Sequence, residues 1–372
     1  MTVERAVLRV YRYNPERDEK PYYREYEVPV DKAQTLLDAL FYIQENLDPT
    51  LGFRFFCRAA VCGSCAVKVN GISRLACKTP FKELVEKANG KPITVEPLNF
   101  LKPIRDLVVD HDQPFESLKK LQTWCEPKEP IPEKEYRIPP EEVKQYERPT
   151  NCILCFACYG SCEAVMDDPK YAGPYAFSRV YRYVVDSRVK EEHKREMVKN
   201  AMDVGDIWSC VQCQKCIYVC PKGVRPAEDI QNVRGTAAEY GFKDYPGVKK
   251  LQHFVDWIYA TGQINRLSLP EEVYGVDPTP LINKFRERGA EVWEVPKPLP
   301  GLLEFRDLVL EVMKEKKPHL DIDFHHVRRI DKRVEEVFNA DVCTKITERF
   351  EEQREDFFTR FWKKLSEFFG AK

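Results

Sequence analysis

Fourteen cysteines occur in this sequence of 372 residues, and twelve of them fall into three groups at spacings typical of metal ligands. In the first group, Cys57-x4-Cys62-x2-Cys65 is followed by Cys77, which is the plant-type pattern for a 2Fe–2S cluster. Gly63 lies inside this loop and allows backbone amides to turn toward the cluster sulfides. A zinc-stapled scaffold is the non-redox alternative, but zinc favours paired C-x2-C hooks, and this spacing is poor for zinc.

The other two groups repeat each other with an offset of 58 residues. Each has the C-x2-C-x2-C-x3-C run of bacterial ferredoxins, and Pro221 follows the second run. Three thiolates of a run bind three corners of a cubane, and the fourth cysteine reaches the other cluster. We therefore expect two 4Fe–4S clusters. The first would be ligated by Cys152, Cys155, Cys158 and Cys220, and the second by Cys162, Cys210, Cys213 and Cys216.

Two cysteines remain outside these groups, Cys125 and Cys343. We expect both to be small buried hydrophobic residues, because neither has a nearby base that would make it a nucleophile. The sequence contains no Ser-His-Asp pattern, Walker loop or G-x-G-x-x-G fingerprint. It therefore predicts no catalytic residue and no flavin or nicotinamide site in this chain. The chain would store and relay electrons, and a partner would carry out the two-electron chemistry.

Charge and hydropathy exclude several classes of function. The 59 Lys and Arg nearly balance the 60 Asp and Glu, so no basic excess indicates nucleic acid as a partner. Residues Met1–Val10 do not have the pattern of a signal peptide, and no run of 18 or more apolar residues predicts a transmembrane span. Clustered cysteines without a signal peptide favour the cytosol, where thiols stay reduced.

The first hundred residues predict a small domain of strands and one main helix. Strands are predicted at Ala6–Tyr13, Tyr23–Val30, Ala66–Val69 and Ile93–Glu96. Thr35 and Asp38 form a capping box that opens a helix, whose apolar positions recur at helical spacing. Asn70–Gly71 predicts a turn after the third strand. The cysteine loop would therefore lie between the helix and that strand.

The composition changes after this domain. Glu126–Pro149 is rich in Pro, Glu and Lys, which is typical of a connector that stays extended and solvated. Helical patterns follow between the two cysteine runs, at Tyr175–Val185 and Glu191–Met202. Beyond Tyr240 the sequence predicts a mostly helical tail.

The order of these parts resembles the iron–sulfur subunit of succinate dehydrogenase and fumarate reductase, over residues 1–240. The motifs that carry the resemblance are Phe56-Cys57-Arg58, Val61-Cys62-Gly63-Ser64-Cys65, Asn70-Gly71, Leu75-Ala76-Cys77-Lys78-Thr79-Pro80, Ile104 to Asp110, Asn151-Cys152-Ile153-Leu154-Cys155, Gly173-Pro174, Tyr181-Arg182, Asp186-Ser187-Arg188 and Cys220-Pro221-Lys222-Gly223.

The resemblance implies an α+β chain with four parts. These are a plant-type 2Fe–2S domain with the β-grasp fold over residues 1–115, a connector over 116–140, an all-α dicluster ferredoxin domain over 141–240 and a helical extension over 241–372. Its implied function is electron transfer in a succinate:quinone oxidoreductase, the respiratory complex II of the tricarboxylic acid cycle. Single electrons would pass between a flavoprotein subunit, which holds FAD, and a membrane-side acceptor. The chain would be cytoplasmic and peripheral on the cytoplasmic face of the cell membrane, held there by membrane-anchor subunits.

Three departures from the family pattern favour an alternative. The family usually has a 3Fe–4S cluster last, because the position of Cys213 is not cysteine, and the thiol here predicts 4Fe–4S instead. Glu163, Asp167 and Val211 stand where quinone-reducing members have residues that line the quinone pocket. The stretch Phe254–Asn265 is loosely similar to heterodisulfide-reductase-like subunits. The alternative is a relay subunit of a thiol-driven fumarate reductase or heterodisulfide-reductase-like complex, with a cysteine-rich partner.

The end of the sequence carries one further pattern. Aromatic residues within Phe350–Lys372 recur at three- and four-residue steps with basic residues between them. This predicts an amphipathic helix with a wide aromatic face. It suits a membrane surface or a partner groove, and packing on the chain's own core is the equal alternative.

Overall fold

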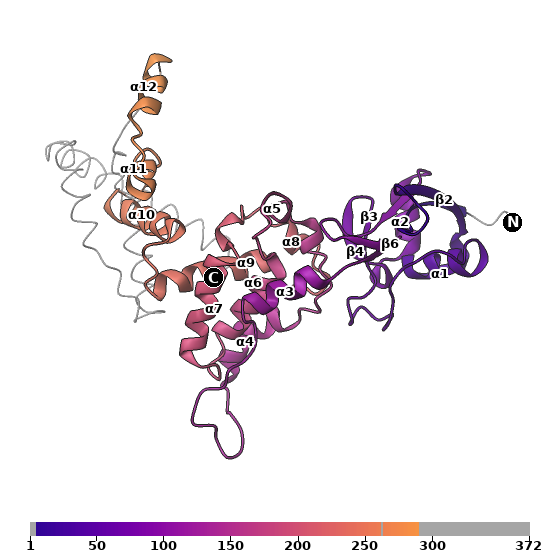
Figure 1. Cartoon of the computed structure of the whole chain (residues 1–372), viewed down its shortest axis with the longest axis horizontal. Coiled ribbons are helices and arrows are strands. Elements are labelled where there is room, and N and C mark those ends of the chain that lie inside the picture. Colours follow the sequence, from indigo (N-terminus) through magenta and orange to yellow (C-terminus); the bar gives the residue numbers. More distant parts are fainter. Residues whose placement is uncertain (1–4, 262, 290–372) are drawn as a thin grey trace, which may run out of the picture. The chain divides into compact units, whose positions relative to one another are not determined.

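The computed structural model describes residues 5–261 and 263–289, and its chain forms two compact units (Figure 1). The first unit is Met1–Tyr240 and holds all twelve clustered cysteines, and the second is Gly241–Lys372. The aromatic pattern at Phe350–Lys372 and the unassigned Cys343 lie outside the described residues.

A five-stranded sheet forms the centre of the first domain. Its strands are β1 (Arg5–Arg12), β2 (Tyr22–Pro29), β3 (Ala66–Val69), β4 (Ile72–Leu75) and β5 (Ile93–Glu96). Their order in the sheet is β2-β1-β5-β3-β4, in which β1 and β5 run parallel and the other neighbours run antiparallel. Sequence predicted four of these strands, but not β4, nor the interior position of β5. The mixed sheet with one main helix fits the predicted β-grasp fold.

Helix α1 (Leu36–Asn46) packs on this sheet because both elements bury one face. Alternate residues of β1, including Leu8 and Val10, are fully buried, as period-two patterning requires. The predicted capping box at the start of α1 is confirmed: the Thr35 hydroxyl accepts from the Asp38 amide, and the Asp38 carboxylate accepts from the Thr35 amide. The core therefore fixes where the cysteine loop after α1 begins.

The smaller elements of the first domain close the sheet and its loops. They are the 3₁₀ turns η1 (Val30–Lys32) and η2 (Ala76–Lys78), helix α2 (Phe81–Ala88), and the strand pair β6 (Pro103–Arg105) and β7 (Val108–Val109). Between β6 and β7, the buried Asp106 accepts from Arg12 Nε at 2.9 Å and from the Gly52 amide at 2.7 Å. This carboxylate ties the end of the domain to its first strand.

The segment between the domains is less extended than its composition predicts. Helix α3 (Asp112–Lys120) spans residue 115, the predicted end of the first domain. Helix α4 (Pro140–Thr150) occupies the end of the proline-rich stretch. The prediction of an extended connector is therefore wrong for residues 140–149. Proline at the first helical position is compatible with a helix start, and Glu141 and Glu142 stabilise the first turn through the helix dipole.

Helices build the rest of the first unit. They are η3 (Tyr159–Ser161), α5 (Glu163–Asp167), α6 (Pro174–Val184), α7 (Glu191–Asp203), η4 (Ile207–Ser209), α8 (Lys215–Tyr218) and α9 (Pro226–Glu239). Sequence predicted α6 and α7 within one residue at each end. Helix α6 is the central one: Tyr175, Phe177 and Val180 are fully buried, and α4, α7 and α9 pack around it (Figure 1). The two cysteine runs lie in the loops beside this helical core.

The second unit is helical where it is described. It contains α10 (Pro246–Thr261), α11 (Leu269–Tyr274) and α12 (Thr279–Glu287). Helices α10 and α11 pack on each other through the buried His253, whose Nδ1 lies 2.9 Å from the Glu272 carboxylate and whose Nε2 lies 2.7 Å from the Asn265 carbonyl. Among the described residues, no helix is both long enough and apolar enough to cross a bilayer.

Candidate metal centres

The loop after α1 surrounds the Cys57 sulfur with backbone donors. The amides of Ala59, Val61 and Cys62 donate to Cys57 Sγ at 3.4, 3.3 and 3.3 Å. These three N–H groups lower the pKa of the Cys57 thiol to about 6, because hydrogen bonds stabilise the thiolate form. A thiolate is the form that binds iron. This arrangement fits a metal cluster, whose sulfurs accept hydrogen bonds in the same way.

The β3–β4 hairpin brings the fourth cysteine of this group to the loop. Asn70 and Gly71 both have positive φ, at 47° and 81°, which is the two-residue turn expected of an Asn-Gly pair. The turn sets the register in which Ala66 pairs with Leu75. As a result Cys77, on η2, follows directly and its amide lies 3.5 Å from the sulfur of Cys65.

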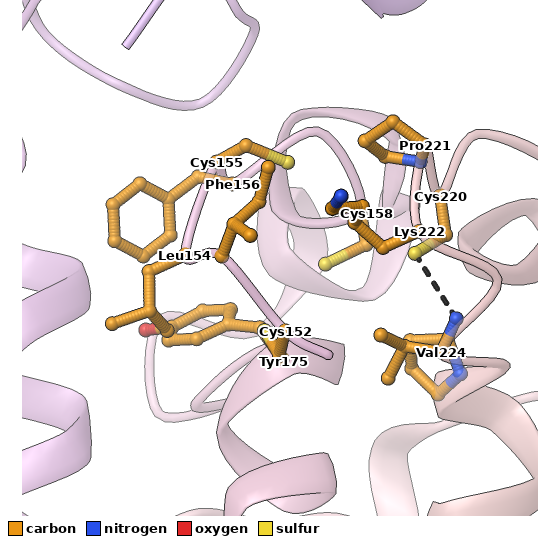
Figure 2. Close-up of a pocket in the computed structure, with 12 residues that line it drawn as sticks. Cys152, Leu154, Cys155, Phe156, Cys158, Tyr175, Cys220, Pro221, Lys222 and Val224 are labelled. Carbon is orange, nitrogen blue, oxygen red and sulfur yellow. Dashed lines mark hydrogen bonds between the residues drawn. The ribbon is translucent and has the colours of Figure 1, made fainter. Parts of the chain in front are cut away.

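The first cysteine run lines a cavity together with a distant residue. A cavity that is partly open to solvent is bordered by the four cysteines predicted to ligate the first cubane: Cys152, Cys155, Cys158 and Cys220. Figure 2 shows the sulfurs of Cys155, Cys158 and Cys220 facing one common space. The Val224 amide donates to Cys220 Sγ at 3.3 Å. Four thiols around an open volume fit a four-iron cluster.

Two left-handed residues coil the chain around this cavity. Leu154 and Phe156 have φ of 51° and 59°, although neither is glycine, and each such residue costs about 1–2 kcal/mol. Burial raises the pKa of Cys155 to about 12 and also raises the pKa of Cys158. The metal-free thiols here are therefore protonated at neutral pH, and cluster binding must release protons.

The second run repeats this backbone geometry. Gln212 and Gln214, 58 residues after Leu154 and Phe156, also have positive φ, at 59° and 64°. They flank Cys213 just as the earlier pair flanks Cys155. Burial raises the pKa of Cys216 to about 12 and that of Cys162 in the same direction. Local sequence could not predict the left-handed positions, but the 58-residue repeat predicts that the two loops match.

The loops of the two domains meet at Gly63. A Cβ at this residue would lie 2.9 Å from the Ile153 carbonyl oxygen and 3.0 Å from Cys155 Cα. The join also includes the Lys78 ammonium, which donates to the Pro221 carbonyl at 2.7 Å, and a hydrogen bond between Ser161 and Ser73 at 2.8 Å. The contact at Gly63 and the hydrogen bond from Lys78 to Pro221 therefore join ligand loops of the two domains. Sequence analysis assigned Gly63 to the cluster loop alone.

The surface beside Cys213 is open and carries both charged and apolar side chains. Cys213 is exposed and borders a groove with Glu163 and Lys215, whose side chains form an ion pair. Val211 next to it is 79% exposed. Glu163, one of the residues that depart from the quinone-pocket pattern, thus interacts with a lysine.

Cys125 differs from its prediction. The sequence predicted a small buried hydrophobic residue, but this cysteine is exposed in the segment after α3. The prediction is wrong because the neighbouring chain does not cover it: Trp124 beside it is also exposed.

Within the described parts of the chain, no three His, Cys, Asp or Glu side chains gather closely enough for a single metal ion.

Comparison with family models matches both halves of the first unit. Residues 7–116 match a 2Fe-2S iron-sulfur cluster binding domain, and residues 149–224 match a 4Fe-4S dicluster domain. These ranges contain the loops described above, in the same order.

Curated relatives match most of their own length to this chain. The fumarate reductase iron-sulfur subunit of Mycobacterium tuberculosis is 37% identical over 245 residues, which cover 65% of this chain and 96% of the relative. The chain belongs to the family of fumarate reductase and succinate dehydrogenase iron–sulfur subunits. Its role, as in that family, is electron transfer within an oxidoreductase complex.

Other members of this iron–sulfur subunit family are similarly related. The 8-methylmenaquinol:fumarate reductase iron-sulfur subunit of Wolinella succinogenes is 35% identical, covering 66% of this chain and 77% of the relative. A solved chain from the Mycobacterium smegmatis Sdh1 complex in the apo form superposes with a TM-score of 0.59 at 26% identity, covering 65% of this subunit and 98% of that chain. The predicted fold, a ferredoxin domain followed by a helical dicluster domain, is therefore confirmed.

Proposed function

We propose that this iron–sulfur subunit relays single electrons through one 2Fe–2S and two 4Fe–4S clusters. The proposed ligands are Cys57, Cys62, Cys65 and Cys77 for the 2Fe–2S cluster, Cys152, Cys155, Cys158 and Cys220 for the first 4Fe–4S cluster, and Cys162, Cys210, Cys213 and Cys216 for the second. The clusters would supply one-electron redox chemistry, which splits a two-electron flavin reaction into single steps.

The matching backbone around Cys155 and Cys213 is the observation that carries this proposal. Cys155 borders the four-cysteine cavity between two left-handed residues, and Cys213 lies between two left-handed residues at the equivalent positions. A thiol in that conformation supports a fourth ligand for the second cluster. We therefore favour 4Fe–4S over the 3Fe–4S cluster that the family resemblance leaves open.

The chain's own residues would set the order of the relay. Contact at Gly63 brings the 2Fe–2S loop against the loop of the first cubane, so those two centres would be neighbours. Cys162 and Cys220 each belong to one run and would ligate the other run's cluster, which keeps the two cubanes adjacent. The route would then run from the first domain through the first cubane to the cluster of Cys213, an exposed ligand that borders a groove.

The partners follow from this direction. The first domain would face a flavoprotein subunit that holds FAD and interconverts succinate and fumarate. The Cys213 side would face a membrane-side acceptor in a succinate:quinone oxidoreductase. Membrane-anchor subunits would hold the complex on the cytoplasmic face of the cell membrane.

Replacing the fourth thiol tests the cluster assignment. In C213S, we expect the oxidised protein to show the paramagnetic resonance signal of a 3Fe–4S cluster, which anaerobically prepared wild type lacks. C125S is the matched control, because Cys125 is exposed but belongs to no ligand group. A stoichiometric 3Fe signal in fresh wild-type protein would contradict the 4Fe–4S assignment.

The ion pair at the groove favours a second candidate function. Glu163 and Lys215 place an ion pair on the rim beside Cys213, and such charges are poor neighbours for an apolar quinone headgroup. The same groove is also lined by Ile217, Tyr218 and Val219. A thiol-driven fumarate reductase or heterodisulfide-reductase-like complex, with a cysteine-rich partner, would use a polar protein surface there.

Activity of the native complex separates the two candidates. The chain would be captured with its partners, and succinate-dependent dye reduction would be measured. Activity together with quinone reduction supports the first candidate. Intact flavin and clusters without succinate oxidation would favour the thiol–disulfide relay.

A further inference from the structure

A buried carboxyl group lies in the helical core beside the first cubane site. Asp229 on α9 is 0% exposed, and its Oδ1 accepts from Arg148 Nη2 at 2.9 Å. Its Oδ2 makes no hydrogen bond of normal geometry among the described residues. The hydroxyl of the fully buried Ser178 on α6 is close enough to Asp229 to lower its pKa. A buried carboxylate with an unpaired oxygen is costly, and protonation removes that cost.

Arg148 connects this carboxyl to the loop that carries Cys220. Its Nη2 donates to Asp229, while its Nη1 donates to the Val224 carbonyl at 3.0 Å. The amide of the same Val224 donates to Cys220 Sγ (Figure 2). One side chain and one residue of backbone therefore link the carboxyl to a proposed cluster ligand.

The groups around Asp229 come from three helices and one loop. Arg148 lies on α4, Ser178 and Tyr181 on α6, and Glu228 on α9 itself, while Cys152 in the loop after α4 is close enough for its thiol pKa to be raised by Asp229. Burial is the largest influence on the carboxyl and raises the pKa of Asp229 to about 7. Near neutral pH, a change of charge at the cluster site can therefore change the protonation state of Asp229.

We propose that Asp229 accepts a proton when the cluster bound by Cys152, Cys155, Cys158 and Cys220 accepts an electron. The inference rests on the ligand set proposed above. The electron comes from the flavoprotein side, the proton comes from water and binds the Asp229 carboxylate, and the added negative charge is offset. When the cluster is reoxidised, the electron passes to the next acceptor and Asp229 releases its proton to water.

The sign of the pH dependence follows directly. An added electron makes the surroundings of Asp229 more negative and favours its protonated form. The midpoint potential of this cluster therefore falls as pH rises through the neutral range. A tenfold change in proton affinity between the two redox states gives a total shift of about 59 mV.

Redox titration of the full-length, anaerobically prepared chain tests the proposal. The midpoint potential of the cluster is followed by paramagnetic resonance at several pH values. In D229N the side chain stays neutral, so we expect a potential that is independent of pH and equal to the wild-type value at low pH. E228Q is the matched comparison, because Glu228 also pairs with Arg148 and its charge raises the pKa of Asp229. E228Q keeps the Asp229 carboxyl, so the pH dependence should remain and should move to lower pH.

Infrared difference spectra give an independent reading on wild-type protein. Reduction should produce the carbonyl band of a protonated carboxyl group, which shifts in D₂O and is absent in D229N. If the D229N variant does not hold the cluster, the S178A variant is measured instead. Its carbonyl band should be shifted relative to wild type, because the hydroxyl that faces Asp229 is missing. No band in wild type, an unmoved band in S178A, or a wild-type slope in D229N would each overturn the inference. A missing resonance signal in the wild-type chain would instead count against the ligand assignment itself.

Discussion

The two ligand loops of the first unit, Cys57–Cys65 and Cys152–Cys158, hold the same thiol chemistry in opposite surroundings. The first loop is partly exposed, and three backbone amides lower the pKa of Cys57 to about 6. The second is built into the helical core, and burial raises the pKa of Cys155 to about 12. Local hydrogen bonds thus prepare one thiolate, at Cys57, in the first loop, although burial raises the pKa of Cys65 at the end of that loop to about 12. In the second loop the protein core prepares the cavity, and the metal must displace protons.

The largest expected effect is the loss of a buried ligand. In C158S we expect no first cubane signal and a loss of at least about 4 kcal/mol in the stability of the dicluster domain, the range for a lost metal centre. Cys57 is only half-buried, so C57S should leave the stability of the rest of the chain nearly unchanged. Thermal unfolding of the anaerobic proteins, with iron content, would measure both. Equal destabilisation by the two variants would break the comparison.

Two phenylalanines, one next to a ligand in each loop, sharpen the same contrast. Phe156 is 1% exposed and meets Tyr175 and Phe115 edge to face, at centroid distances of 5.0 and 5.5 Å. F156A should therefore cost about 3–5 kcal/mol. Phe56 is 80% exposed, and F56A should change stability by no more than about 0.5 kcal/mol. Denaturant unfolding would check these values, and a large cost for F56A would contradict the exposed character of the first loop.

A single methyl group at the contact between the loops should have an intermediate effect. G63A places a Cβ against the Ile153 carbonyl and Cys155, at a φ of 78°, so overpacking of about 1–3 kcal/mol adds to the left-handed strain. G71A is the control, because Gly71 has a similar φ of 81° but open space around it. We expect G71A to cost only the left-handed strain of about 1–2 kcal/mol. If both variants unfold at the same denaturant concentration, the close approach at Gly63 has no energetic weight.

The smallest expected effect is kinetic. In metal-free protein at pH 7, we expect iodoacetamide to alkylate Cys57 at least about tenfold faster than Cys158, although the lower nucleophilicity of a low-pKa thiolate offsets part of its greater abundance. The rate at Cys57 should fall as pH drops through about 6, because protonation removes the thiolate. Peptide mass spectrometry would follow both sites. A rate at Cys57 that still rises between pH 8 and 9 would show that the backbone donors do not act as described.

Sequence predicted the parts of this chain that are governed by local rules. The capping box at Thr35 and the turn at Asn70–Gly71 depend on contacts within four residues, and both formed as expected. The ligand groups depend on spacing, and the cavity that collects Cys152, Cys155, Cys158 and Cys220 agrees with the interleaved pairing. These features need no knowledge of the rest of the fold.

The features that sequence missed depend on distant contacts. Leu154 and Phe156 adopt left-handed backbone because the loop must coil around a volume, and nothing in their residue types indicates it. Gly63 has a role set by Ile153 and Cys155, ninety residues away. The exposure of Cys125 depends on which segments happen not to cover it. Proline content misled the prediction at α4, because proline is unfavourable inside a helix but suitable at its start.

The join between the two domains has a consequence for how the protein is made. Gly63 belongs to a proposed ligand loop, and so do its contacts Ile153 and Cys155, so ligation of a cluster would fix both sides of this contact. A newly synthesised chain that has not received the 2Fe–2S cluster and the first cubane would therefore lack a rigid contact between its two domains. The segment that links these domains would then be open to proteases. Cluster insertion would then act as a maturation checkpoint, because only fully loaded chains would present a rigid surface to the subunits that assemble with them.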